Sequence, residues 1–160
     1  MNPQAILDAT ANIAGGAVTS RPGVYKGAGG IAGVRIAFSR PQEANNIAED
    51  GPMHVSFWDG LEIDPDGTAA GDQTVFKHTI RMQLSIAPGR SELPKAYGIL
   101  TPFVPLYVAA FAAKVKLNST CSVALLRRSP GIVESIYPDR IALEWILEAT
   151  EKEAVTYVAA

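Results

Sequence analysis

One segment of the chain, Thr74 to Ala87, alternates apolar and polar side chains almost without interruption. Successive side chains of a β-strand point to opposite faces, so this pattern predicts a half-buried strand with one face on a core and the other in water. The face predicted to be buried carries Phe76, His78, Ile80, Met82, Leu84 and Ile86. The face predicted to be wet carries Val75, Lys77, Thr79, Arg81, Gln83 and Ser85.

A second strand is predicted just before it, from Met53 to Asp64. The sequence Asp64-Pro65-Asp66-Gly67 follows, and it has the chemistry of a turn, since proline fixes φ and Asp and Gly tolerate turn geometry. Residues 53–87 are therefore predicted to form a long antiparallel β-hairpin. It is longer than a core requires, which predicts that it projects from the domain.

Helical spacing marks two other parts of the chain. Asn2 and Pro3 suit a cap and a first helical position, and they predict a helix over residues 3–14 that ends at Gly15-Gly16. Residues 91–116 predict one helix kinked near Pro102, or two in succession. The apolar stripe predicted for this second region comprises Leu93, Ala96, Tyr97, Leu100, Val104, Val108, Phe111, Ala112 and Val115.

The remaining strands are shorter or less clear. Residues 120–128 predict a strand, Ser129-Pro130-Gly131 a turn, and residues 141–150 a last core strand that includes Trp145. Short strands are expected at 24–25 and 33–39. The sequence predicts a single domain over residues 1–160, with 151–160 as a C-terminal arm. Its class is α+β: a mostly antiparallel sheet with helices packed on one face, plus the long projecting β-hairpin.

Composition and charge narrow the functional classes. The 160 residues are 48% hydrophobic and 19% charged, which is typical of a globular chain. The formal net charge is −2, and this argues against nucleic-acid binding as the main task, which needs a basic patch. Cys121 is the single cysteine, so an intrachain disulfide is excluded. The apolar run 103–113 is too short to span a bilayer and contains Pro105, so no membrane partner is expected.

Two segments resemble ligand sites. Residues 27–32, with the sequence GAGGIA, match a nucleotide-binding loop, but no long strand precedes them and no amphipathic helix follows, which favours an ordinary loop. An acidic cluster is the only weak metal candidate, because its oxygens suit Mg²⁺ or Ca²⁺, while its spacing favours a solvated hairpin tip. The cluster consists of Asp59, Glu62, Asp64 and Asp66.

No catalytic constellation is visible, and no enzyme activity or cofactor is expected. His54 and His78 have no third ligand at metal-binding spacing, and burial with a satisfied hydrogen bond is the better interpretation of His78. Cys121, beside Ser122, lies on the apolar face of a predicted strand, where cysteine acts as a small hydrophobe. The nucleophile motif GxSxG is absent.

Interface candidates are clearer than catalytic ones. Trp58 lies near the acidic turn, and aromatic residues concentrate binding energy at interfaces. The predicted wet face of the Thr74–Ala87 strand is where a neighbouring subunit is expected. The interface candidates are Trp58, Lys77, Arg81, Gln83 and, in the C-terminal arm, Tyr157.

The order of elements resembles the tail terminator (tail completion) proteins of long-tailed bacteriophages. The likeness rests on length, hydrophobic pattern, the helix sequence PFVPLYV at 102–108 and the closing strand RIALEWILE at 140–148. It covers most of the chain from Pro3 to about Glu153. The segments 17–51 and 53–87 match it least.

The resemblance implies a structural virion protein rather than an enzyme. It implies a homohexameric ring, assembled in the bacterial cytoplasm, that caps the tail tube, ends tube polymerisation and presents the head-to-tail joining surface in the virion tail or neck. The implied partners are the tail tube protein and a head-side connector protein, with DNA passing through the ring without sequence-specific binding. Another head–tail connector or neck adaptor is the alternative, followed by a small α+β ligand-binding domain or enzyme.

Overall fold

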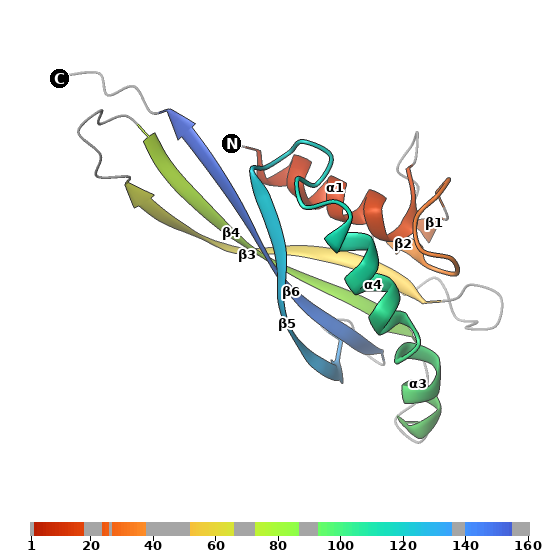
Figure 1. Cartoon of the computed structure of the whole chain (residues 1–160). Helices are drawn as coiled ribbons and strands as arrows, with labels where there is room; N and C mark the ends of the chain where they lie inside the picture. Colours follow the sequence, from red (N-terminus) through yellow and green to blue (C-terminus); the bar gives the residue numbers. More distant parts are fainter. Residues whose placement is uncertain are drawn as a thin grey trace.

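The computed structural model describes residues 2–17, 24–25, 27–37, 52–65, 73–86, 93–135 and 140–154. They form an α+β fold in which the described strands make one sheet of order β1-β2-β3-β4-β6-β5 with helices on one face (Figure 1). The pairings are antiparallel except for that of β2 with β3, so the predicted fold class is confirmed. The elements are α1 (Pro3–Gly15), β1 (Val24–Tyr25), β2 (Arg35–Ala37), β3 (Met53–Pro65), β4 (Gln73–Ile86), α3 (Leu93–Leu100), α4 (Phe103–Ala112), β5 (Val123–Glu134) and β6 (Ile141–Ala154).

The central strand β4 confirms the alternation seen in the sequence. Its six predicted core side chains, from Phe76 to Ile86, are all buried. They face the helices, together with the apolar side chains of β6, and we call this side of the sheet the helix face. The opposite side, which carries Lys77 and Arg81, is called the polar face.

The projecting β-hairpin is not confirmed. β3 does pair with β4 from Met53↔Ser85 to Pro65↔Thr74, but β6 follows the other edge of β4 along its whole length. The three strands therefore form one ribbon that runs past the helices (Figure 1). The segment that would form the hairpin turn, 66–72, lies outside the described residues.

The first helix follows the sequence signals at both ends, whereas the second helical region ends earlier than predicted. The Asn2 side chain caps α1 by accepting a hydrogen bond from the Ala5 amide at 3.1 Å. The helical region after residue 91 is divided at Thr101-Pro102, which confirms the expected break. However, α4 ends at Ala112, and four members of the predicted stripe are exposed, so the stripe is wrong at Tyr97, Val108, Ala112 and Val115.

The true buried stripe of α4 contains Tyr107 and Phe111. Tyr107 stacks on Phe111 at 5.9 Å between ring centroids and on Trp145 at 5.7 Å, which confirms Trp145 as a core residue. Since every residue of α4 is apolar, the sequence pattern alone did not distinguish the buried side from the exposed one.

The predicted turn at Ser129-Pro130-Gly131 is wrong. β5 continues through it, with register shifts against β6 between Leu126 and Arg128 and between Arg128 and Gly131. The Ser129 hydroxyl donates to the Glu144 carbonyl and accepts the Gly131 amide, so it replaces ladder bonds that the bulged backbone cannot make. Turn residues here produce a bulged strand rather than a reversal.

Candidate functional site

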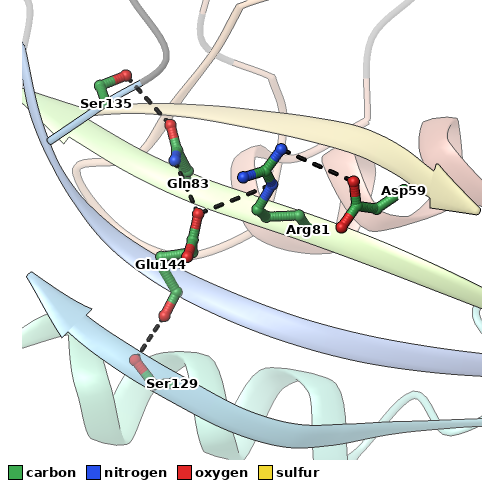
Figure 2. A network of polar contacts seen from close by, with 6 residues as sticks. All are labelled: Asp59, Arg81, Gln83, Ser129, Ser135 and Glu144. Carbon is green, nitrogen blue, oxygen red and sulfur yellow. Dashed lines mark hydrogen bonds and ion pairs between the residues drawn. The ribbon is translucent and has the colours of Figure 1, made fainter. Parts of the chain in front are cut away.

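The polar face of β4 carries Arg81 and Gln83, two of the interface candidates from the sequence. Arg81, Gln83 and Glu144 come together there, because Gln83 and Glu144 are register partners on β4 and β6 and Arg81 lies two residues before Gln83 (Figure 2). Asp59 joins them from β3, and Ser135 from the end of β5. We call these five residues the Arg81 cluster.

One half of the Arg81 cluster is closed. The Gln83 amide donates to Glu144 Oε1 at 2.9 Å and accepts the Ser135 hydroxyl at 3.1 Å (Figure 2). Gln83 is 1% exposed, so it has no surface to offer a partner, contrary to the expectation from the sequence. Gln83 does lie on the polar face, as the alternation of the sequence predicted, but the side chains of Glu144 and Ser135 cover it there.

The other half of the cluster is open. Arg81 Nε lies 3.8 Å from Glu144 Oε1, and Arg81 Nη2 lies 3.7 Å from Asp59 Oδ1, both too long for hydrogen bonds (Figure 2). Arg81 Nε is buried without a hydrogen-bond partner, while the guanidinium group stands 5.9 Å from the Phe57 ring. Because the Arg81 and Asp59 side chains are 34% and 48% exposed, an incoming group can reach both.

The described members of the acidic cluster lie at separate positions along β3. Asp59, Glu62 and Asp64 are spread along the strand, and Asp59 faces Arg81 across a bulge between Trp58 and Leu61. In the described part of the chain, no group of three or more potential ligands is placed to hold a metal ion. Asp66 and Tyr157 lie outside the described residues.

The two histidines lie far apart in the sheet, since His54 is the register partner of Leu84 and His78 that of Leu61. His78 is buried as predicted, with two partners: Trp58 Nε1 donates to its Nδ1 at 3.0 Å, and its Nε2 lies 2.8 Å from Glu151. The Trp58 indole therefore occupies one side of His78 while remaining 43% exposed itself.

His54 belongs to a buried hydrogen-bond chain that the sequence did not reveal. Its Nδ1 lies 2.7 Å from the Tyr107 hydroxyl and its Nε2 2.7 Å from Ser56 Oγ, which lies 2.7 Å from Thr10 Oγ1. Burial lowers the pKa of His54 to about 3 and raises that of Tyr107 far above its usual range. Both groups are therefore neutral near pH 7, and the chain joins α1, β3 and α4.

Neither remaining candidate forms a reactive site. Burial, followed by the nearby charge of Glu151, raises the pKa of Cys121 to about 11, so the thiol is protonated near neutral pH. In the glycine-rich segment, the Gly27 amide donates to the Gly15 carbonyl at the end of α1. A Cβ on Gly30 would lie 2.4 Å from the Gly16 nitrogen, so these glycines permit tight backbone packing at a helix C-terminus, where a phosphate would find carbonyl groups rather than amides.

The outer side of α4 carries exposed apolar side chains. Leu106 and Val108 are 44% and 48% exposed, and Val115 just beyond the helix is 40% exposed. The stretch Pro94–Ala112 has the length and apolar composition of a membrane-crossing helix, although it is divided at Thr101-Pro102. This stretch is longer than the apolar run 103–113 that the sequence analysis identified.

No protein-family model matches this chain, and no curated protein matches it at a significant level.

Proposed function

We propose that this chain is a structural subunit of a bacteriophage tail, which assembles into a hexameric ring on the end of the tail tube. The ring ends tube polymerisation and presents the surface to which the head-side connector binds. The proposal is supported by the order of elements, which resembles that of tail terminator proteins, and it requires no catalytic group.

One observation carries the assembly part of the proposal. All ten residues of α4 are apolar, yet its buried residues are Tyr107 and Phe111, and Leu106 and Val108 face outward. Exposed apolar side chains gathered on one element are typical of a surface that another molecule covers. A protein partner is favoured because a helical element interrupted at Thr101-Pro102 suits a rigid protein contact better than a bilayer crossing.

The test is an assembly assay. The purified chain is mixed with tail tube protein from the same source while the tube polymerises, and tube length and end structure are measured by negative-stain electron microscopy. We expect shorter tubes that carry a ring at one end. A chain that leaves tube length unchanged and never forms rings would overturn the proposal, and binding to portal protein instead would identify a neck adaptor.

A matched pair of variants tests the surface itself. Leu106→Glu places a charge on the exposed side of α4 and is expected to abolish capping. Lys95→Glu changes an exposed charge on α3 and is expected to leave capping intact. If the wild-type chain instead binds anionic lipid vesicles and Leu106→Glu removes that binding, the surface serves a membrane and the proposal fails.

A further inference from the structure

The described sheet has two open edges. β5 ends the sheet on one side. On the other side, β2 pairs only with Met53 and His54, so β3 has no strand partner from Val55 to Pro65 among the described residues. Open sheet edges are natural places for chains to meet.

The β3 edge carries two exposed apolar side chains, and the ladder register fixes their positions along the sheet. Trp58 is 43% exposed, and further along the same face Ile63 is 58% exposed. Residues paired across the ladder place Trp58 in one row with Ile80, Leu147 and finally Leu126 of β5. Trp58 at one edge and Leu126 at the other therefore lie level with each other on the helix face.

The β5 edge has a groove at that level. A cavity of about 380 Å³ lies between α4 and β5, and its lining includes Val108, Phe111, Val115, Leu126 and Trp145. Trp145 is 5% exposed, and its indole Nε1 is buried without a hydrogen-bond partner. The groove is mainly apolar, and Arg127, Arg128 and Ser129 complete its lining on the β5 side.

Opposite charges occupy the polar face of the same two edges. Asp59, Glu62 and Asp64 are exposed on β3, whereas Arg127 and Arg128 are exposed on β5. Arg128 shares a ladder row with Ile146, Arg81 and Phe57, which places it near the height of Asp59. Arg127 donates to Glu148 at 3.0 Å, whereas Arg128 has no ion-pair partner among the described residues.

We propose that the α4–β5 groove binds a second copy of this chain, whose Trp58 enters the groove while Asp59 of its β3 meets Arg128. The contact is head-to-tail, so each copy uses its β3 edge on one neighbour and its β5 edge on the other. The inference rests on the ring-forming part of the proposed function and names the surfaces that would form the ring.

Strand directions agree with this contact. β3, β4, β6 and β5 are successive antiparallel neighbours, so β3 and β5 run in opposite directions. If the sheet continues sideways into the next copy, β5 meets an antiparallel β3, and the helix and polar faces both stay matched. A two-fold contact between two β5 edges would oppose Arg128 to Arg128, and one between two β3 edges would oppose acid to acid.

Side chains rather than a continuous backbone ladder mediate the contact. The outward amide of Ala124 already donates to the Val115 carbonyl, and bulges interrupt β5 between Leu126 and Gly131. The register shift at this point leaves both Arg127 and Arg128 on the polar face, since Arg127 bonds Glu148 and Arg128 pairs with Ile146. Specificity therefore comes from one aromatic side chain in a groove and from charge.

The experiment measures self-association of the full chain by sedimentation at several concentrations. Trp58→Ala removes the inserted side chain, and Val108→Glu places a charge in the groove wall. Each is expected to weaken association by about tenfold or more, as interface anchors do. The matched control Tyr97→Ala truncates an aromatic side chain of similar exposure, 48%, on α3 and is expected to associate like the wild type.

Mixing the two variants tests the head-to-tail geometry. A Trp58→Ala copy keeps its groove and a Val108→Glu copy keeps its tryptophan, so the mixture is expected to form a one-to-one dimer that neither variant forms alone. Trp58 and Trp145 are the two tryptophans, and Trp145 is already buried, so wild-type association is also expected to shift tryptophan emission to shorter wavelength.

Several outcomes would overturn the inference. They are a wild-type chain that stays monomeric at its highest soluble concentration, a Trp58→Ala variant that is folded by circular dichroism and associates like the wild type, and a variant mixture that stays monomeric. If rings form and cap tubes regardless of Trp58, the inference fails while the proposed function stands. If association depends on Trp58 but tubes are never capped, the proposed function fails while the inference stands.

Discussion

The chain contains two networks of polar side chains, and only one of them has all its hydrogen bonds made. The first runs from Tyr107 through His54 and Ser56 to Thr10 in the core, and the second is the Arg81 cluster on the polar face. Every group of the first has a hydrogen bond of 2.7 Å, whereas Arg81 in the second has only two ion-pair distances of 3.7 and 3.8 Å.

The protons of the core network have a single arrangement. The Thr10 hydroxyl donates to the Leu7 carbonyl, so Ser56 donates to Thr10. Ser56 must then accept from His54 Nε2–H, which leaves His54 Nδ1 to accept the Tyr107 hydroxyl. Each donor of the network has its acceptor, so no donor is left for a partner.

The Arg81 cluster has unused capacity. Gln83 and Glu144 are buried and bonded, but the buried Arg81 Nε has no hydrogen bond and Asp59 is about half exposed. A network that is complete stabilises the monomer, whereas one that is open at the surface has groups left for a partner. His54 therefore contributes to the stability of the fold, whereas Asp59 and Arg81 keep exposed groups that a partner could bind.

The largest expected effect comes from breaking the closed network. His54→Ala leaves the Tyr107 and Ser56 hydroxyls without partners and creates a cavity between α4 and β3, so we expect a loss of about 3–4 kcal/mol in unfolding free energy. Urea denaturation followed by circular dichroism measures it. Lys77→Ala on the polar face, as the control, should change stability by less than about 0.5 kcal/mol; a His54→Ala loss below about 1 kcal/mol would contradict the assignment.

Acid should weaken the same network through protonation. The folded pKa of His54, about 3, lies below the ordinary value of 6.5, so the unfolded chain binds the proton first and stability falls as pH drops below 6.5. Between pH 7 and pH 5 this amounts to about 2 kcal/mol, at 1.36 kcal/mol per pKa unit. The measurement is denaturation at both pH values with His54→Gln as control; an equal pH dependence in the two proteins would remove His54 as the cause.

Local patterns predicted the framework of this fold. The alternation of Thr74–Ala87 placed a strand with the correct buried face, and Asn2-Pro3 and Thr101-Pro102 marked helix boundaries. These signals depend on neighbours within one element, which a single sequence contains. The uniform apolarity of α4 and the turn-like Ser129-Pro130-Gly131 were misleading because the orientation of α4 and the bulges of β5 depend on contacts with β6.

The candidate site was less accessible for the same reason. Arg81 and His78 stood out by residue type, but their partners Glu144 and Glu151 follow from the register of β6 against β4, which the sequence does not specify. Gln83 illustrates the consequence: its alternation is correct, yet the opposing Glu144 buries it. His54 was noticed, whereas its chain to Tyr107 and Thr10 required the packing of two helices on β3.

A smaller effect is expected at the closed half of the Arg81 cluster. Gln83→Ala removes the amide that bonds Glu144 and Ser135, so a loss of about 1–2 kcal/mol in unfolding free energy is expected. Adding Ser135→Ala should cost less in the Gln83→Ala background than alone, because the two side chains share one bond. Strict additivity in this double-mutant cycle would show that the contact contributes nothing.

The smallest effect on stability, and the one that separates the two networks most sharply, is expected at Asp59. Asp59→Asn weakens an ion pair that is already 3.7 Å long and about half exposed, so the unfolding free energy should change by less than about 0.5 kcal/mol. Self-association should nevertheless weaken, by about threefold at low salt, because the neighbour's Arg128 loses an opposing charge, and this difference should shrink at high salt. Sedimentation of both proteins at low and high ionic strength, beside their denaturation curves, measures the two effects separately. A variant that loses stability but associates normally would reverse the comparison, since Asp59 would then serve the fold of its own chain and not the contact with the next.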